Sequence, residues 1–292
     1  MTTKYFHLYL IVCIFFSLTA CKEKTSQQRT VSVSILPQQY LVERIAGDYL
    51  QVNVMIPPGM NPATCDLSTG QLKKLYDSDI CFTVGYLPFE LSHLYPVLEN
   101  RKQIKVINHS ENLNLLSGGC GHQHDESHEH GGVDPHIWLS PAYAKKMATT
   151  IYQVLSEQYP EQKQVFQTNY ESLVQDIDSI ANKAEQVLKD KKDKTFLIYH
   201  PALTYLAHDY GMEQISIEDE GKEPNPAHLK EIIDLAHEKN IRIIFIQNQF
   251  DVKNAESVAR QIGARVISID PLTADWLTEM NKLIQIFETE LE

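Results

Sequence analysis

Three side chains of types that can bind transition metals occur next to proline residues. His200 ends the apolar run FLIYH just before Pro201, and Asp270 ends VISID just before Pro271. Ligands of open parallel sheets bind beyond the carboxyl ends of the strands, and imidazole and carboxylate are ordinary zinc ligands. His136, within DPHIWLSP, could be a core histidine, but the two strand-end side chains favour a shared site. We therefore treat His136, His200 and Asp270 as candidate metal ligands.

A second group of metal-binding side chains lies in the low-complexity segment 118–132, GGCGHQHDESHEHGG. Its four histidines are His122, His124, His128 and His130. Imidazole suits zinc, copper and nickel, but ordering a glycine-flanked segment costs conformational entropy. We expect a mobile loop that binds metal weakly and exchangeably. The alternative is a solvated polar loop without a ligand.

Strands that alternate with helices predict an α/β fold with a parallel sheet in each half of the chain. The expected strands are 31–36, 52–56, 80–84 and 105–107, then 196–199, 214–217, 243–246 and 266–269. Apolar residues from 165 to 188 recur every three or four positions, which is typical of one buried helix face. We predict two α/β lobes, 31–158 and 191–292, joined by a long rigid helix at 159–190.

The N-terminus predicts export and lipidation. Lys4 precedes an apolar run at 8–18, which is shorter than the ~20 residues of a membrane-spanning helix but typical of a signal peptide. Leu18-Thr19-Ala20-Cys21 resembles a lipobox, where bacterial lipoproteins are cleaved and lipidated; the alternative is a buried core helix. We expect a signal peptide at 1–20, lipid on Cys21, a tether at 21–30, and a membrane-anchored protein facing the periplasm or cell exterior.

Charge and cysteine content argue against a nucleic-acid-binding protein, a zinc finger and a disulfide-based fold. The formal net charge is −12, and no basic stripe could neutralise phosphates, so we expect no nucleic-acid partner. After loss of Cys13 and lipidation of Cys21, Cys65, Cys81 and Cys120 allow at most one disulfide and have no zinc-finger spacing. We interpret the remaining conspicuous side chains as a solvated acidic face and as packing residues: Glu218, Asp219, Glu220 and Glu223, and Trp138 and Trp276.

Longer motifs resemble one family along nearly the whole mature chain. They are VSVSILPQQYLVERIAGD, VNVMIPPGMNP, DPHIWLSP, YHPALTYLAHDYGM, EPNPAHLKEII and VISIDPL. The chain resembles the metal-ion solute-binding proteins of zinc- and manganese-type ABC importers, and a His-rich loop ahead of DPHIWLSP is typical of the zinc branch. The resemblance implies that His136, His200 and Asp270 bind Zn²⁺, with Mn²⁺ as an alternative, and that an ABC permease receives the metal. We expect a monomer.

One position departs from that family. A histidine ligand normally follows the PPG turn, whereas Ala63 occupies the matching position in PPGMNPATCD. Water, Cys65, Asp66 or a histidine of the mobile loop could take the fourth position. Weaker zinc capture, a different metal and an altered function all remain open.

Two other functions compete with metal transport. Zinc with three protein ligands could activate water in an enzyme, but the chain has neither an HExxH nor a GxSxG motif, so we expect no catalysis. Alternatively, the His-rich loop could make the protein a surface metal store or chaperone.

Overall fold

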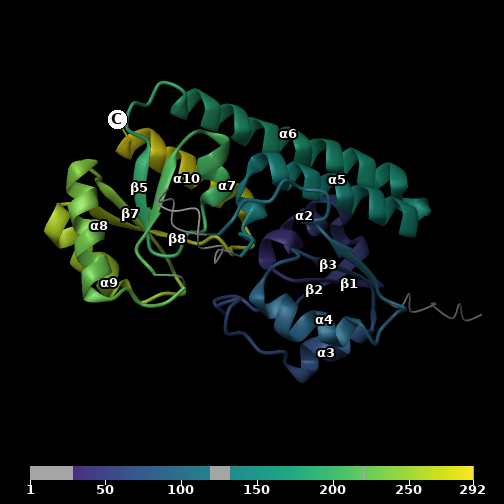
Figure 1. The fold of residues 1–292 in the computed structure, drawn as a ribbon. Coiled ribbons are helices and arrows are strands. Elements are labelled where there is room, and N and C mark those ends of the chain that lie inside the picture. Colours follow the sequence, from purple (N-terminus) through teal and green to yellow (C-terminus); the bar gives the residue numbers. More distant parts are fainter. Residues whose placement is uncertain (1–28, 119–131, 220, 292) are drawn as a thin grey trace, which may run out of the picture.

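The first half of the chain folds around a four-stranded parallel sheet with the strand order β2-β1-β3-β4. The computed structural model describes residues 29–118, 132–219 and 221–291 (Figure 1). The predicted signal peptide, Cys21, Cys120 and the four loop histidines therefore lie outside the described residues. The strands are β1 (Arg29–Val33), β2 (Leu50–Val54), β3 (Ser78–Thr83) and β4 (Lys105–Asn108).

The second half repeats this topology. Its sheet is also parallel and has the order β6-β5-β7-β8. The strands are β5 (Thr195–Ile198), β6 (Glu213–Ser216), β7 (Ile243–Gln247) and β8 (Arg265–Ile269). The prediction of two parallel α/β lobes is confirmed, with strand bounds that differ by a few residues.

Helices cover both faces of the second sheet, which explains why its strands are apolar on both sides. Phe196 and Ile198 of β5 belong to a core that includes Phe287, whereas Leu197 and Tyr199 belong to a second core. The first core contains α10 (Trp276–Glu290), and the second contains α8 (Pro226–Glu238) and α9 (Val252–Ile262). Both faces of the strand are thereby removed from water.

The long helix α6 (Lys163–Leu188) connects the two lobes (Figure 1). Its 26 residues correspond to a length of about 39 Å. It packs against α2 (Leu36–Ala46) and α5 (Pro141–Gln158) of the first lobe and against α10 of the second. The predicted helix between the lobes is confirmed, although it begins later than expected because a 3₁₀ turn, Pro160–Gln162, precedes it. One hydrophobic core includes residues of both lobes and of α6, which favours a stiff connection.

Short helices complete the two lobes. They are a 3₁₀ turn at Gly47–Tyr49, α3 (Thr69–Tyr76), a π-helical turn at Glu90–Leu94, α4 (Tyr95–Leu98), a 3₁₀ turn at Ile137–Leu139, and α7 (Thr204–Asp209). Within residues 29–118, 132–219 and 221–291, no helix combines the length and the apolar character needed to cross a bilayer.

Candidate metal-binding site

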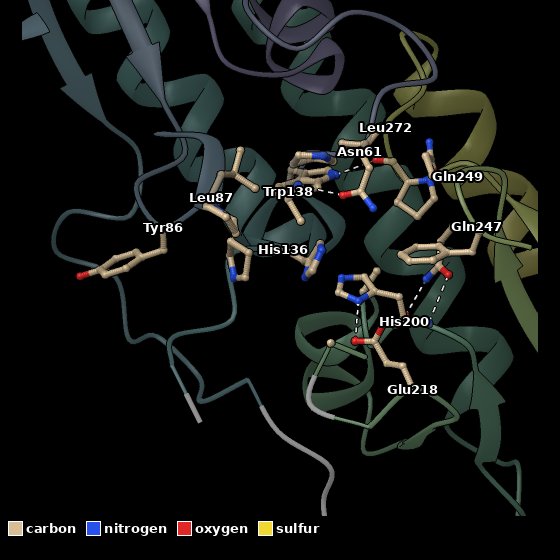
Figure 2. A pocket seen from close by; sticks show the side chains of 18 of the residues that line it. Asn61, Tyr86, Leu87, His136, Trp138, His200, Glu218, Gln247, Gln249 and Leu272 are labelled. Atoms are coloured by element: carbon tan, nitrogen blue, oxygen red, sulfur yellow. Dashed lines mark hydrogen bonds and ion pairs between the residues drawn. The ribbon is translucent and has the colours of Figure 1, made fainter. Parts of the chain in front are cut away.

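A cavity of about 260 Å³ lies between the lobes. Loops that follow β2 and β3 supply one wall, and residues at the carboxyl ends of β5, β6 and β7 supply the other (Figure 2). His136 and His200 both line it, and their rings lie close together. The structure therefore brings two of the three predicted ligands to one cavity, at the strand ends where an open parallel sheet binds its ligands.

His136 is held by the turn that precedes the 3₁₀ segment. The Asp134 carboxylate oxygen Oδ1 accepts a hydrogen bond from the His136 backbone N–H at 2.8 Å and lies 2.9 Å from its Nδ1. The Tyr205 hydroxyl donates to the Asp134 carbonyl oxygen at 2.8 Å and fixes this turn from the second lobe. Burial opposes the charged form of Asp134, but the adjacent His136 and its hydrogen bonds outweigh burial and hold the carboxyl pKa below its usual value.

His200 is fixed by the two strands that flank β5. Its Nδ1 lies 2.7 Å from Glu218 Oε1, at the end of β6. Gln247, the last residue of β7, accepts from the His200 backbone N–H at 3.3 Å and donates to its carbonyl oxygen at 2.6 Å. Figure 2 shows these contacts on the side of the ring away from His136. Phe250 stacks on the imidazole, with ring centroids 5.5 Å apart and an interplanar angle of 25°.

The two histidines have the same protonation pattern. Each presents Nδ1 to a carboxylate, which selects the tautomer with the proton on Nδ1 and the lone pair on Nε2. Within the described part of the chain, neither Nε2 has a hydrogen-bond partner. The ring centroids are 5.1 Å apart, so two lone pairs are available for one electrophile in the cavity.

The other predicted ligand positions lie around this pair. Asp270 is half-buried at the end of β8, and its Oδ1 accepts from the Leu272 N–H at 3.2 Å. Pro271 and Leu272 line the cavity, whereas Asp270 itself is not among the lining residues. Among the residues that the structure describes, no three His, Cys, Asp or Glu side chains are grouped closely enough to hold a metal ion. The structure thus supplies a histidine pair, with Asp270 at its margin.

The PPG-turn segment approaches the cavity without a metal-binding side chain. Ala63 lines the cavity, and its N–H donates to Asn61 Oδ1 at 2.8 Å. Cys65 is buried and is not among the lining residues, and its burial raises the pKa of the thiol, with a further contribution from Asp66. The thiolate form that binds metals is therefore disfavoured.

The interpretation of Glu218 as part of a solvated acidic face is wrong. Only 4% of its surface is exposed, because its carboxylate is bonded to His200. Sequence reasoning also missed Asp134, which is buried beside His136. The available signal was positional: Glu218 lies two residues beyond β6, the strand next to β5, and Asp134 lies two residues before a candidate ligand.

Both tryptophans are buried, and they also join the site segments across the lobes. The Trp138 indole N–H donates to the Pro271 carbonyl oxygen at 2.7 Å. The Trp276 indole N–H donates to the Trp138 carbonyl oxygen at 2.8 Å. These bonds link the segment that carries His136 to the turn that follows Asp270.

Relatives in sequence are zinc proteins. The chain is 27% identical over 278 residues to the zinc-binding lipoprotein AdcA of Streptococcus pneumoniae strain R6, an alignment that covers 92% of this chain and 54% of AdcA. It is 23% identical over 292 residues to the high-affinity zinc uptake system protein ZnuA of Bacillus subtilis, covering 93% and 90%. The chain thus spans about half the length of AdcA.

Solved structures and a family description agree with these relatives. A crystal structure of ZnuA superposes with a TM-score of 0.83 at 32% identity and covers 91% of this chain and 100% of that one. The Zn(II)-bound ZnuA-like domain of Streptococcus pneumoniae AdcA shares the fold, with a TM-score of 0.74 at 24% identity, covering 90% and 98%. Residues 31–291 match the family described as ZnuA, zinc-uptake complex component A, periplasmic. The resemblance expected from the sequence motifs is confirmed: the chain belongs to the ZnuA family of zinc-uptake components.

Proposed function

We propose that this protein is an extracytoplasmic, lipid-anchored solute-binding protein that captures zinc between its lobes and passes it to an ABC permease. The observation that carries the proposal is the pair His136 and His200, whose Nδ1 atoms are both held by carboxylates while both rings line one cavity. The zinc-related names of the relatives support the choice of metal. No catalytic step is required.

The spacing of the two imidazoles suits a shared metal ion. Zinc–nitrogen bonds are about 2.0–2.1 Å long, and tetrahedral geometry then separates the ring centres by about 5 Å. The centroids of His136 and His200 are 5.1 Å apart. The carboxylates on Nδ1 orient the rings and raise the basicity of the nitrogens that face the metal.

We propose Asp270 as the third ligand, because it directly follows β8 and its neighbours Pro271 and Leu272 line the cavity. Carboxylate also accepts manganese, so Mn²⁺ is the alternative metal.

Calorimetry on metal-free protein tests the ligand set. We expect His136→Ala to weaken zinc binding by about 100-fold or more, since loss of a ligand costs more than the 10–100-fold that follows loss of a group supporting one. Asp270→Ala should weaken it less. His93→Ala is the matched control, because His93 is partly exposed, lies 3.6 Å from Asp66 and does not line the cavity. If His136→Ala and Asp270→Ala both bind zinc as tightly as the parent, the proposed site is wrong.

Anchoring and delivery need separate experiments. We expect Cys21→Ala to abolish labelling by radioactive fatty acid and to release the protein from the membrane fraction. Deletion of the protein should slow growth only when zinc is scarce, and His200→Ala should fail to restore it. Growth restored fully by His200→Ala would contradict the proposed transport role.

A further inference from the structure

We propose that the cavity binds zinc together with one small exogenous imidazole-type ligand, which completes the coordination beside Ala63. The inference rests on the proposed zinc function of His136 and His200. It identifies what the protein recognises: a metal complex whose organic part lies in the cavity.

The protein supplies an incomplete set of donors for zinc. Zinc in a closed site has four ligands, whereas the cavity wall presents two imidazoles with open Nε2 atoms and the Glu218 carboxylate. The carboxylates of Asp134 and Glu218 are bonded to the Nδ1 atoms of these rings. Adding Asp270 gives three protein ligands and leaves one position for a donor from solution.

The cavity is larger than a metal ion and one water molecule require. Its volume of about 260 Å³ far exceeds the ~30 Å³ that a water molecule occupies in the liquid. It approaches the lower end of the ~300–1,000 Å³ range of pockets that bind small organic molecules. A lone metal ion would leave most of this space unfilled. Ala63 has only a methyl side chain, so it leaves space in the cavity that a larger side chain at this position would fill.

The wall of the cavity combines apolar and hydrogen-bonding side chains. Ala63, Leu87 and Pro88 give the first-lobe side an apolar part, and Phe250, which stacks on His200, adds an aromatic ring from the second lobe. A flat, partly apolar ring can be desolvated against such a wall at little cost, unlike a hydrated anion. Asn61 and Gln249 also line the cavity, and their amide oxygens can accept the ring N–H that does not face the metal.

Charge further favours a neutral donor over an anion. Two carboxylates, Asp134 and Glu218, lie directly behind the histidines, and the chain carries a formal net charge of −12. A carboxylate or phosphate from solution would meet like charge at close range. Neutral imidazole is a zinc ligand without this penalty.

Zinc titrations with and without imidazole test the proposal. We expect imidazole in excess over zinc to tighten the apparent zinc affinity of the metal-free protein by about tenfold, equivalent to about 1.4 kcal/mol. Imidazole also binds zinc in solution, so simple competition would weaken the apparent affinity. An affinity that is unchanged or weaker with imidazole overturns the inference.

Two substitutions at one position sharpen the test. Ala63→His supplies an imidazole from the chain, so zinc should bind more tightly without imidazole and gain nothing when it is added. Ala63→Leu fills space without a donor, so it should abolish the gain from imidazole. A full gain retained in Ala63→Leu overturns the proposed location.

The two proposals fail in distinguishable ways. If the parent binds zinc but imidazole does not tighten it, only the exogenous ligand is wrong. If the parent binds no zinc with or without imidazole, the proposed function itself is wrong.

Discussion

The two lobes share one strand order, and each has a histidine just beyond a strand, yet only one of these histidines faces the cavity. His109 follows β4 in the first lobe and is 5% exposed. His200 follows β5 in the second lobe, and 31% of its side chain is exposed. His109 instead stacks on Phe82, with ring centroids 5.4 Å apart and planes at 9°. Position at a strand end is therefore insufficient; exposure distinguishes the two.

The hydrogen-bond partners of the two rings also select opposite tautomers. Gln38 Oε1 accepts from the Ser34 N–H at 2.9 Å, so its amide nitrogen is the group that donates to His109 Nδ1 at 2.9 Å. His109 therefore carries its proton on Nε2, which has no partner among the described residues. Glu218 accepts from His200 Nδ1 and leaves the Nε2 lone pair free. The amide beside His109 Nδ1 therefore leaves its Nε2 protonated, whereas the carboxylate beside His200 Nδ1 leaves its Nε2 free to bind a metal.

The largest expected effect separates these histidines directly. We predict that His200→Ala weakens zinc binding by about 100-fold or more, because it removes a donor. His109→Asn, which keeps an acceptor for Gln38, should leave zinc affinity within about twofold of the parent. Calorimetry on both variants checks this. Comparable losses in the two variants would mean that exposure and tautomer do not distinguish the lobes.

A smaller effect is expected from the carboxylate behind the ring. Glu218→Gln keeps the volume but removes the charge that fixes the tautomer of His200, and we predict a loss of zinc affinity of about 10–100-fold. Gln38→Ala is the counterpart in the first lobe and should leave affinity unchanged. Full affinity in Glu218→Gln would show that the negative charge of Glu218 is not needed for zinc binding.

Stability should respond to pH through the first lobe. Burial lowers the pKa of His109 to about 3, below the value of ~6.5 for an exposed histidine. Between these values the unfolded chain binds a proton that the folded chain does not. The free energy of unfolding should therefore fall as pH drops below ~6.5, by up to about 1.4 kcal/mol per pH unit from this group. The free energy of unfolding should fall less steeply with decreasing pH in His109→Asn, as measured by urea unfolding from pH 7 to 4. Equal pH dependence in the parent and the variant would contradict a lowered pKa of His109.

The smallest effect is expected from removal of the His-rich segment. The Gly118 N–H donates to the Gly132 carbonyl oxygen at 2.6 Å, so the two ends of the segment meet and can be joined by a short linker. We predict that deletion of residues 119–131 leaves tight, stoichiometric zinc binding unchanged and removes only weak additional sites. Loss of the tight site would favour a metal store in the loop.

Sequence reasoning reached the elements that follow a local pattern. Short apolar runs predicted the eight strands found in the described residues, and the three–four spacing of residues such as Phe166, Leu173 and Ile177 predicted α6. His200 was selected because it follows a strand, and His136 because it lies in the DPH motif. Both line one cavity.

The remaining features depend on which strands become neighbours. Glu218 is 18 residues from His200 in sequence, and only the pairing of β5 with β6 brings them together. The hydrogen bond to the buried His109 likewise comes from Gln38, which is 71 residues away in the sequence. Local patterns carry no information about such pairings, so the contact between Glu218 and His200 and the burial of His109 were not predicted.

Anomalous diffraction at the zinc edge, from crystals of the protein grown with equimolar zinc, tests the central claim most directly. We predict one dominant peak in the cavity, about 2.0–2.1 Å from the Nε2 atoms of both His136 and His200. A dominant peak elsewhere, with both Nε2 atoms free of metal, would contradict the account.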